Sequence, residues 1–328
     1  MAVLVTGATD FLGSHLAMAL RDRGVVVTGR DRGKLARLTA LGLRGLPMDL
    51  AFHVSAADRD RIGPVEAVVH CAGLSSPWGR QSAFQAANVD ATQHLLELSR
   101  QLGAKRFVFV STASVYFQFC DQDGLREGDL PPEFVNAYAT TKHQAEIAVL
   151  AHGDLSPVVI RPRGIYGAGD TTLLPRLMRV AARRRMPCFS PAGATDVTHV
   201  DDVVAACIAA LDAPDDMGGA IFNVSGGVGV ALPDVITAAC IATGVTPRWR
   251  DLPFAPTLAT VRMMERLAKC MPGYPEPPVT AYALGILRYR QTMNIDAAKK
   301  QLNWQPQVSF QEGVARTFKD GALRPGVL

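Results

Sequence analysis

Short apolar runs alternate with longer mixed segments along the first half of the chain. Runs of about five apolar residues that end at glycine or polar positions are typical of strands buried on both faces of a parallel sheet. The segments between them have the length of helices, so the pattern predicts alternating strands and helices. The expected strands span residues 2–6, 25–28, 43–50, 66–70, 106–110 and 157–161, and the longest expected helix spans 81–102.

The second half of the chain is less regular. Its pattern predicts helices over 173–185 and 198–211 and a buried strand over 220–224. Asp201 and Asp202 are expected to cap the second of these helices. From 252 to 287 the chain is rich in Pro, Met, Leu and Tyr and poor in acids. This composition is typical either of an apolar cover over a binding site or of the core of a small domain.

The composition is that of an ordinary globular protein. Apolar residues make up 48% and charged residues 20% of the 328 residues, and the net charge of +4 is too small to indicate a nucleic-acid partner. The six cysteines are scattered without metal-site spacing, so we expect reduced thiols and no metal. Because we find no leader-like segment and no apolar run of membrane-spanning length, we expect a cytoplasmic protein.

The turn after the first expected strand is rich in glycine. A glycine turn between a strand and a helix holds the pyrophosphate of a dinucleotide on the helix N-terminus. The turn therefore predicts a cofactor site. Its expected binding residues are Gly7, Thr9, Asp10, Phe11, Leu12 and Gly13.

Asp10 stands where this fingerprint has its middle glycine. A carboxylate about 5 Å from a phosphate charge would cost about 3 kcal/mol at an effective dielectric constant near 20. Two interpretations stay open. Asp10 either caps the helix, with its charge satisfied by the helix amides, or weakens or alters the cofactor site.

The end of the second expected strand bears on the choice of cofactor. Arg30 lies where an NADP enzyme needs a cation beside the 2′-phosphate, with Arg32 or Lys34 assisting, whereas Asp31 suits the ribose of NAD. We therefore expect NADP(H), with NAD(H) as the alternative. Asp49, at the end of the third strand, is placed to accept from the adenine amino group. Ala72 lies in the tight exit from the fourth strand, beside the cofactor.

Hydroxyl groups follow the fifth expected strand, and a tyrosine and a lysine follow on a helix. Ser111, Thr112 and Ser114 lie at the carboxyl end of a parallel strand, where ligands bind in open α/β sheets. Tyr138 and Lys142, four residues apart, share one helix face, and a cation beside a phenol lowers the pKa of the phenol. This pair predicts a proton donor.

The loop over residues 75–80 is longer than the sheet requires. Because it follows a strand end, we expect it to form a wall of the substrate site, with Ser75 and Trp78 as substrate-binding residues.

In their order and spacing, the glycine turn, the strand-end hydroxyls, the Tyr138–Lys142 pair and the segment 161–167 resemble the extended short-chain dehydrogenase/reductase family. The family places its hydroxyl partner four residues before a tyrosine that corresponds to Tyr116, which implies Thr112. Phe117 departs from the glycine that usually follows that tyrosine. The further cofactor-binding residues that the resemblance implies are Leu50, Asn88, Pro162 and Ile165.

The resemblance implies an α/β fold of Rossmann type, a doubly wound parallel sheet with a smaller cap. Residues 1–168 plus 197–225 are expected to form the dinucleotide-binding domain, and 169–196 plus 226–328 the substrate-binding cap. The strand at 220–224 is expected to rejoin the main sheet. A homodimer through the helices at 81–102 and 136–151 is also implied.

Segments 278–284 and 291–298 are similar to the branch of the 3β-hydroxysteroid dehydrogenases and bacterial 2-alkyl-3-oxoalkanoate reductases. We therefore predict an NADP(H)-dependent enzyme that interconverts a ketone and a secondary alcohol on an apolar small molecule. Tyr138 would protonate the substrate oxygen, Thr112 would bind that oxygen, and Lys142 would bind the nicotinamide ribose.

Two alternatives stay open. One is a nucleotide-sugar epimerase or dehydratase with bound NAD, in which an arginine cluster would bind the diphosphate. The other is a cofactor-sensing relative without turnover. The arginines of the cluster, which otherwise face water at a helix end, are Arg179, Arg183, Arg184 and Arg185.

Overall fold

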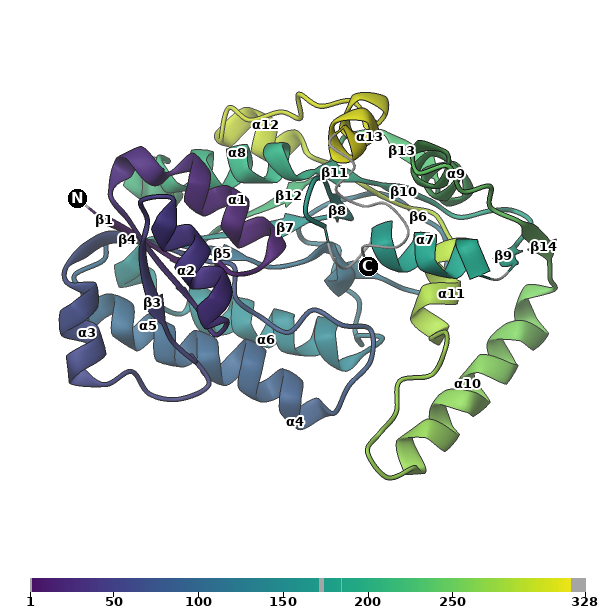
Figure 1. Ribbon diagram of the computed structural model, residues 1–328, viewed down its shortest axis with the longest axis horizontal. Helices are drawn as coiled ribbons and strands as arrows, with labels where there is room; N and C mark the ends of the chain where they lie inside the picture. Colours follow the sequence, from purple (N-terminus) through teal and green to yellow (C-terminus); the bar gives the residue numbers. More distant parts are fainter. Residues whose placement is uncertain (1, 171–173, 184, 320–328) are drawn as a thin grey trace.

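The computed structural model describes residues 2–170, 174–183 and 185–319, without the side chains of residues 175, 176, 179 and 183. In this part of the chain, seven parallel strands form one sheet in the order β12-β7-β5-β4-β1-β2-β3 (Figure 1). The predicted doubly wound fold is confirmed. The strands are β1 (Ala2–Thr6), β2 (Val25–Gly29), β3 (Arg44–Pro47), β4 (Val65–His70), β5 (Arg106–Val110), β7 (Pro157–Pro162) and β12 (Ala220–Val224).

Helices cover both faces of this sheet because successive strand residues point to opposite sides. Val3 and Val5 of β1 pack into one core, whereas Leu4 packs into the other. The first core also takes α1 (Phe11–Ala19), α2 (Arg32–Ala40), α8 (Val200–Leu211) and α12 (Asp296–Gln301). The second core takes α3 (Ala56–Ile62), α5 (Ala91–Gln101) and α6 (Ala137–Leu150).

A smaller part of the molecule lies beyond the carboxyl end of this sheet, toward the right in Figure 1. Its largest sheet has the order β13-β10-β15-β6. The strands are β13 (Gly229–Ala231), β10 (Ala194–Asp196), β15 (Gln291–Met293) and β6 (Gln122–Leu125). Two strand pairs join β11 (Thr198–His199) to β8 (Ile165–Tyr166) and β14 (Trp249–Asp251) to β9 (Met186–Cys188). The helices are α7 (Leu174–Arg183), α9 (Leu232–Ala242), α10 (Phe254–Cys270), α11 (Ala281–Arg288) and α13 (Phe310–Phe318).

The two parts exchange strands. The strand β12, from the second half of the chain, completes the main sheet beside β7, as expected. Conversely, β6 comes from the first half and pairs with β15 in the smaller sheet, which the sequence pattern did not predict. The domain boundaries inferred from the sequence stay a prediction.

The helix expected over 81–102 is interrupted. The segment begins as α4 (Gln81–Phe84), continues as a π-helical turn over Gln85–Asp90 and ends as α5. A π-helical turn inside a helix is rare and is found mostly at functional sites. Because hydrophobic periodicity looks almost the same through such a turn, the sequence did not reveal it.

The expected helix over 198–211 begins two residues late, at Val200, because Thr198 and His199 pair with β8 as β11. The prediction that Asp201 and Asp202 cap this helix is also wrong. His199 is the N-cap residue. Asp202 is buried and accepts the backbone amides of Gln307 and Val308, at 2.8 and 3.2 Å. It therefore fixes the segment that leads into α13.

None of the described helices is both long enough and apolar enough to cross a bilayer. All six cysteines are free thiols.

Candidate active site

Helix α6 carries the Tyr138–Lys142 pair at its N-terminal end. Asn136 caps the helix, because its side-chain oxygen accepts the Ala139 amide at 2.8 Å, which fixes the first turn. The Tyr138 hydroxyl lies close enough to the Ser75 and Thr112 hydroxyls for both to lower the pKa of the phenol. The structure thus brings together three residues from three separate stretches that the sequence singled out.

Burial raises the pKa of the Tyr138 phenol, and the neighbouring Ser75 and Thr112 hydroxyls lower it in part. The phenol therefore keeps its proton at neutral pH. A protonated phenol that contacts a strand-end hydroxyl is suited to donate a proton to a substrate oxygen.

Lys142 does not act on the phenol as the sequence suggested. Its ammonium donates to the Val110 carbonyl oxygen at 2.7 Å and lies 4.0 Å from the centre of the Phe109 ring. Burial lowers the pKa of Lys142 to about 8, against the opposing effect of the Glu146 carboxylate. The expectation that Lys142 lowers the pKa of Tyr138 is wrong for this structure, because the ammonium donates to the Val110 carbonyl and has no resolved effect on the pKa of the phenol.

A buried ion pair lies one helical turn behind Lys142. The Arg161 guanidinium donates from Nε and Nη2 to the two Glu146 carboxylate oxygens, at 2.9 and 2.7 Å, and both side chains are 1% exposed. Arg161 also donates to the Tyr116 hydroxyl at 2.6 Å and to the Glu127 carbonyl at 2.8 Å. The pair ties α6 to β7, and sequence reasoning gave Glu146 no role.

A chain of hydroxyl groups leads from Thr112 toward the smaller part of the molecule. Thr112 Oγ1 donates to Ser114 Oγ at 3.1 Å, and Ser114 Oγ lies 2.9 Å from the Tyr282 hydroxyl on α11. Ser114 is therefore placed beside the expected catalytic residues. Sequence reasoning missed Tyr282 as a site residue, because nothing in its surrounding pattern indicates where its ring points.

Asn88 lies on the π-helical turn and holds the exit from β4 against α6. Its side-chain oxygen accepts the Leu74 amide at 2.7 Å, and its side-chain nitrogen donates to Thr141 Oγ1 at 3.1 Å. A cofactor contact for Asn88 stays a prediction.

The glycine turn has no room for side chains at two positions. Gly7 has a φ of +68°, and a Cβ atom there would lie 2.7 Å from the Ala72 amide nitrogen. A Cβ atom on Gly13 would lie 2.2 Å from the Gly7 carbonyl oxygen. The side chain of Thr9 fills the space above Gly29, at the end of β2. The turn is therefore packed against the ends of β2 and β4, as a cofactor cradle requires.

Asp10 occupies the N-cap position of α1, but its carboxylate accepts no helix amide. The capping interpretation is therefore wrong for this side chain. Asp10 is exposed, and its charge raises the pKa of Cys71 as a minor contribution beside burial. The first amides of α1 thus keep their capacity for an anionic ligand, with a carboxylate close by.

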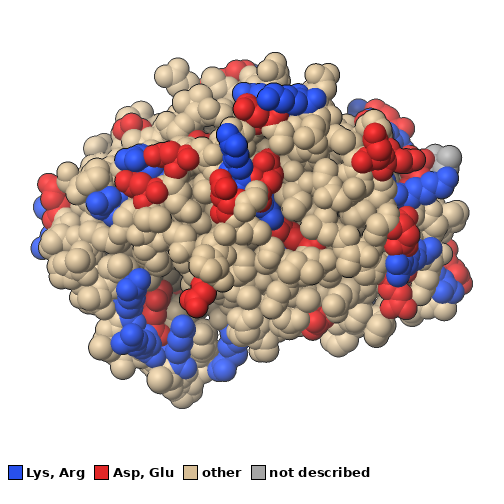
Figure 2. All heavy atoms as spheres, turned by 180° about the vertical axis from the view of Figure 1, so that it is seen from behind, with Lys and Arg blue, Asp and Glu red and all other residues tan. Residues whose placement is uncertain are grey.

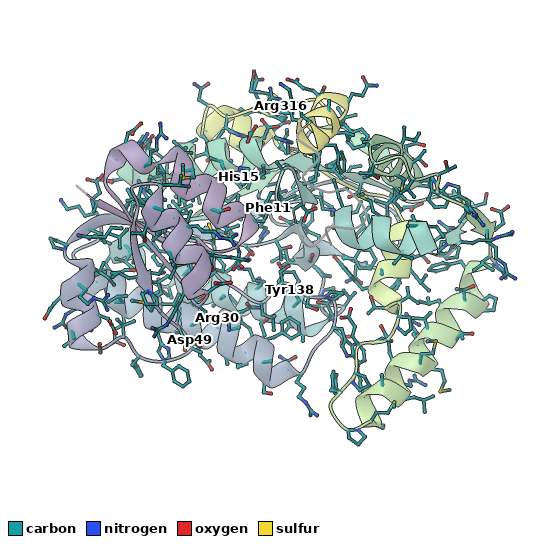
Figure 3. The ribbon with its side chains drawn as sticks, in the orientation of Figure 1. Phe11, His15, Arg30, Asp49, Tyr138 and Arg316 are labelled. Atoms are coloured by element: carbon teal, nitrogen blue, oxygen red, sulfur yellow. The ribbon has the colours of Figure 1, made fainter. Side chains whose placement is uncertain are left out.

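Phe11, the next residue, lies partly buried beside the loop that follows β8. A Cβ atom on Gly167 would lie 3.3 Å from the Phe11 ring, and that ring meets His15 edge to face at 5.4 Å (Figure 3). The loop after β8 is thereby held against the glycine turn.

Arg30 and Asp49 follow β2 and β3 and lie at the same edge of the sheet as Tyr138 (Figure 3). Arg30 is exposed, and it has no hydrogen-bond or ion-pair partner within the described residues. Asp31 instead accepts the Lys34 amide at 2.9 Å and caps α2. Asp49 is exposed and accepts the Ala51 amide at 3.1 Å. The cofactor roles of Arg30 and Asp49 stay predictions.

The remaining predicted residues are placed as follows. Trp78 stacks on Tyr274 with ring centres 5.0 Å apart, so its loop contacts the smaller part of the molecule. Leu50 and Pro162 are buried, whereas Leu12 and Ile165 are partly buried against the first core. Of the arginine cluster, the side chains of Arg179, Arg183 and Arg184 lie outside the described residues.

The chain is similar to known proteins over nearly its whole length. The chain is 29% identical to a 2-alkyl-3-oxoalkanoate reductase of Stenotrophomonas maltophilia, over 96% of this chain and 98% of that protein. It is 28% identical to a 4-hydroxy-2-methyl-3-oxo-4-farnesyl-3,4-dihydroquinoline-1-oxide ketoreductase of Stigmatella aurantiaca, over 100% of this chain and 99% of that protein. The solved structure of MoeE5 in complex with UDP-glucose and NAD has a TM-score of 0.74 and 27% identity, and covers 97% of this chain and 98% of that one.

The family model of the NAD dependent epimerase/dehydratase family matches residues 3–225. The match includes the glycine turn, the strand-end hydroxyls, the Tyr138–Lys142 pair and β12, and it confirms the predicted resemblance. The chain therefore belongs to the NAD dependent epimerase/dehydratase family.

Proposed function

We propose that this protein is an NADP(H)-dependent oxidoreductase that interconverts a ketone and a secondary alcohol on a largely apolar substrate. The observation that carries the proposal is that the hydroxyls of Tyr138, Thr112 and Ser75 lie together at the carboxyl edge of the sheet, where Thr112 also donates to Ser114. Two similar proteins are named as reductases of oxo groups on alkyl or farnesyl compounds, which supports a lipid-like substrate.

The residues present suit a nicotinamide dinucleotide. The turn over 7–13 would hold the pyrophosphate, because Cβ atoms on Gly7 or Gly13 would collide with neighbouring backbone and the α1 amides lack a side-chain cap. Arg30 would bind the 2′-phosphate, and Lys142 the nicotinamide ribose. When bound, the cofactor supplies the hydride for a carbonyl carbon, or accepts it in the reverse direction.

The side chains of the protein bind the carbonyl oxygen of the substrate and supply its proton. Tyr138 donates its phenolic proton to the carbonyl oxygen as that oxygen gains negative charge, which forms the hydroxyl of the secondary alcohol. Thr112 and Ser114 hold the oxygen in place and stabilise the developing charge. The raised pKa of Tyr138 favours the reductive direction, because the phenol starts protonated.

The direct test is to incubate the purified protein with NADPH and a panel of 2-alkyl-3-oxoacids and steroid ketones, and to follow loss of the reduced cofactor. Loss that depends on an apolar ketone supports the proposal. Conversion of a nucleotide sugar without net loss of cofactor would instead select the epimerase alternative. Binding of a nicotinamide cofactor in calorimetry, without turnover of any compound in the panel, would select the cofactor-sensing alternative.

Arg30→Ala is expected to weaken NADPH binding and to leave NADH binding unchanged. A charge-assisted hydrogen bond of about 1.5–3 kcal/mol corresponds to roughly a 10–100-fold rise in the dissociation constant. Calorimetry on both cofactors measures this effect. Arg37→Ala is the matched control, because Arg37 is also exposed and lies in the last turn of α2, the helix that follows Arg30. Equal loss of affinity for both cofactors would contradict the assignment to the 2′-phosphate.

Asp10→Gly is expected to tighten the binding of both NADPH and NADH, because it removes a carboxylate beside the pyrophosphate site. The gain should be roughly tenfold, which is less than about 3 kcal/mol would give, because Asp10 is exposed and water and salt screen its charge. Asp10→Asn should reproduce most of the gain, since it removes the charge and nearly keeps the shape. The dissociation constants again give the measurement. If neither variant binds the cofactors more tightly than the parent, the carboxylate does not oppose the cofactor.

Tyr282→Phe is expected to lower kcat/KM about tenfold, since it removes one substrate-side hydroxyl hydrogen bond. The ring contact with Phe117, at 5.0 Å between centres, is retained. Steady-state kinetics measure the effect. The control is Tyr289→Phe, whose ring contacts Phe254 and Phe119. Equal kinetics for the two variants would exclude Tyr282 from the substrate site.

The proposal includes the assembly and location predicted from the sequence. We infer a homodimer through the segments 81–102 and 136–151, which light scattering tests, and the 57% exposure of Ile147 on α6 supports it. A cytoplasmic location is supported by the six free thiols. We also propose the division into a dinucleotide-binding domain of 1–168 plus 197–225 and a cap formed by the remaining residues.

A further inference from the structure

Helix α10 exposes an apolar face. The helix lies at the outer edge of the smaller part of the molecule (Figure 1), and Val261 and Ala268 are its buried residues. Beside this buried side, Met263, Met264 and Leu267 are 53%, 36% and 60% exposed, and Met271, just past the helix, is 54% exposed. Met263, Met264 and Leu267 fall on one side of the helix at helical spacing, and Met271 follows its last turn. We call them the α10 apolar face.

A row of basic side chains flanks the α10 apolar face. Arg262, Arg266 and Lys269 are exposed and follow one another at helical spacing. Arg262 also lies over the Phe119 ring, 4.9 Å from its centre, and Lys269 over the Trp78 ring, 5.8 Å from its centre. Basic side chains gather over this end of the molecule, at the lower left of Figure 2. Glu265 is the only acid between residues 252 and 275, and its carboxylate turns toward α11, where it accepts the Ala281 amide at 2.8 Å. The outward surface of α10 is therefore apolar and positively charged.

We propose that α10 docks on the surface of an anionic lipid bilayer. A helix with an apolar face, rich in methionine and leucine, beside a basic row lies in the plane of a membrane interface. The apolar face would enter the boundary between headgroups and acyl chains, and Arg262, Arg266 and Lys269 would contact the anionic headgroups.

A bilayer suits this surface better than a second copy of the chain does. In a two-fold contact between α10 helices, the two basic rows would lie in one interface, and their like charges would repel each other. Four exposed side chains also fall short of the roughly 800 Å² per partner that a stable interface buries. An anionic bilayer needs no such area and attracts the basic row.

The backbone leads from the α10 apolar face to the wall of the candidate active site, since the Tyr274 amide donates to the Met271 carbonyl at 3.1 Å. Tyr274 stacks on Trp78, and the loop of Trp78 also carries Ser75, whose hydroxyl lies beside that of Tyr138. Docking through α10 would therefore bring the active site to the membrane surface, where a lipid-like substrate is concentrated. This link to the substrate rests on the proposed function, whereas the docking itself does not.

The test is sedimentation of the full chain with vesicles of phosphatidylcholine, with and without phosphatidylglycerol, in the absence of cofactor and substrate. We expect binding to the anionic vesicles, which weakens as salt rises. The double variant Met263→Ser/Leu267→Ser should bind at least about tenfold more weakly, because two apolar side chains no longer enter the bilayer. Arg262→Glu/Arg266→Glu should abolish the preference for anionic vesicles.

Ile241→Ser is the matched control, because Ile241 is 68% exposed on α9, away from α10. It should bind vesicles like the parent. Thermal unfolding checks that each variant is folded. Failure of the parent to bind anionic vesicles, or equal binding by the parent and the Met263/Leu267 variant, would overturn the proposal. Self-association that light scattering detects in the parent, and that Met263→Ser/Leu267→Ser abolishes, would also overturn the proposal if the parent binds no vesicles. It would assign the α10 apolar face to a contact with a second copy of the chain. Because no turnover is measured, these outcomes are independent of the ketoreductase assay.

Discussion

Tyr138→Phe is expected to lower kcat by about 10³-fold, because a positioned general acid contributes roughly 10²–10⁴-fold to a proton transfer. The substitution removes one oxygen and keeps the ring that faces Phe84, with 6.3 Å between ring centres. Cofactor binding and thermal stability should therefore stay near those of the parent. Steady-state kinetics, calorimetry and a melting curve separate these effects.

Tyr274→Phe is the matched control for this variant. It also removes a phenol hydroxyl near the candidate site, but Tyr274 contacts Trp78 through its ring and its backbone oxygen. Its kcat should stay within about twofold of the parent, as expected for a group that takes no part in the proton transfer. Retained turnover in Tyr138→Phe would falsify the proposed mechanism.

The pH profile of the parent gives an independent check on Tyr138. Reduction needs the protonated phenol, and burial raises the pKa of that phenol above its ordinary value of 10. Ionisation of Tyr138 should therefore leave the reductive kcat constant through neutral pH and lower it only in the alkaline range. Tyr138→Phe should lose this alkaline fall in whatever residual rate it shows.

Glu146→Gln is expected to be the most destabilising of the substitutions considered, by about 3–5 kcal/mol. Breaking one partner of a buried ion pair leaves the other charge uncompensated. Arg161, which is 1% exposed, would lose the carboxylate that receives two of its N–H groups. Denaturant unfolding at neutral pH measures the loss of unfolding free energy.

Asp154→Asn is the matched control, since Asp154 accepts two N–H groups of Arg100, at 2.6 and 2.7 Å, on the surface. Both of these side chains are half exposed, so water and salt screen the pair and its loss should be a small fraction of the loss in Glu146→Gln. Equal losses in the two variants would mean that burial adds nothing to the pair.

The same ion pair predicts how stability depends on pH. Bonding to Arg161, acting against burial, holds the pKa of Glu146 below its ordinary value of 4.5. The folded state therefore binds a proton less readily than the unfolded state. The stabilisation is fully present above pH 4.5 and is lost as the pH falls through the lower, folded-state pKa. Glu146→Gln should show a shallower acid limb than the parent.

The sequence predicted the main sheet well because buried parallel strands carry a strong local signal. The strand 106–110 was predicted with its observed bounds, and 220–224 was placed in the main sheet, where it pairs with β7. The strand β6 was missed because Gln122-Asp123-Gly124-Leu125 is mostly polar and becomes a strand only through pairing with β15, far along the chain.

For the candidate site, sequence motifs identified residue types better than side-chain directions. The meeting of Thr112 and Tyr138 follows from parallel topology, which places strand ends and helix starts at one edge. The direction of the Lys142 ammonium depends on the Val110 carbonyl, and the position of Tyr282 depends on the packing of α11. Such contacts arise from tertiary packing, and local patterns do not encode them.

The exchange of strands between the two parts bears on how the chain folds during synthesis. The main sheet stays incomplete until residue 224 has left the ribosome, since β12 covers the edge of β7. The strand β6, synthesised early, finds its partner β15 only when residues 291–293 emerge. Thr112 and Ser114 lie shortly before β6 in the chain. The hydrogen bonds that join their hydroxyls to Tyr282 can therefore form only after nearly all of the polypeptide has been made. Both parts are therefore expected to acquire their final structure late and together, as one cooperative unit.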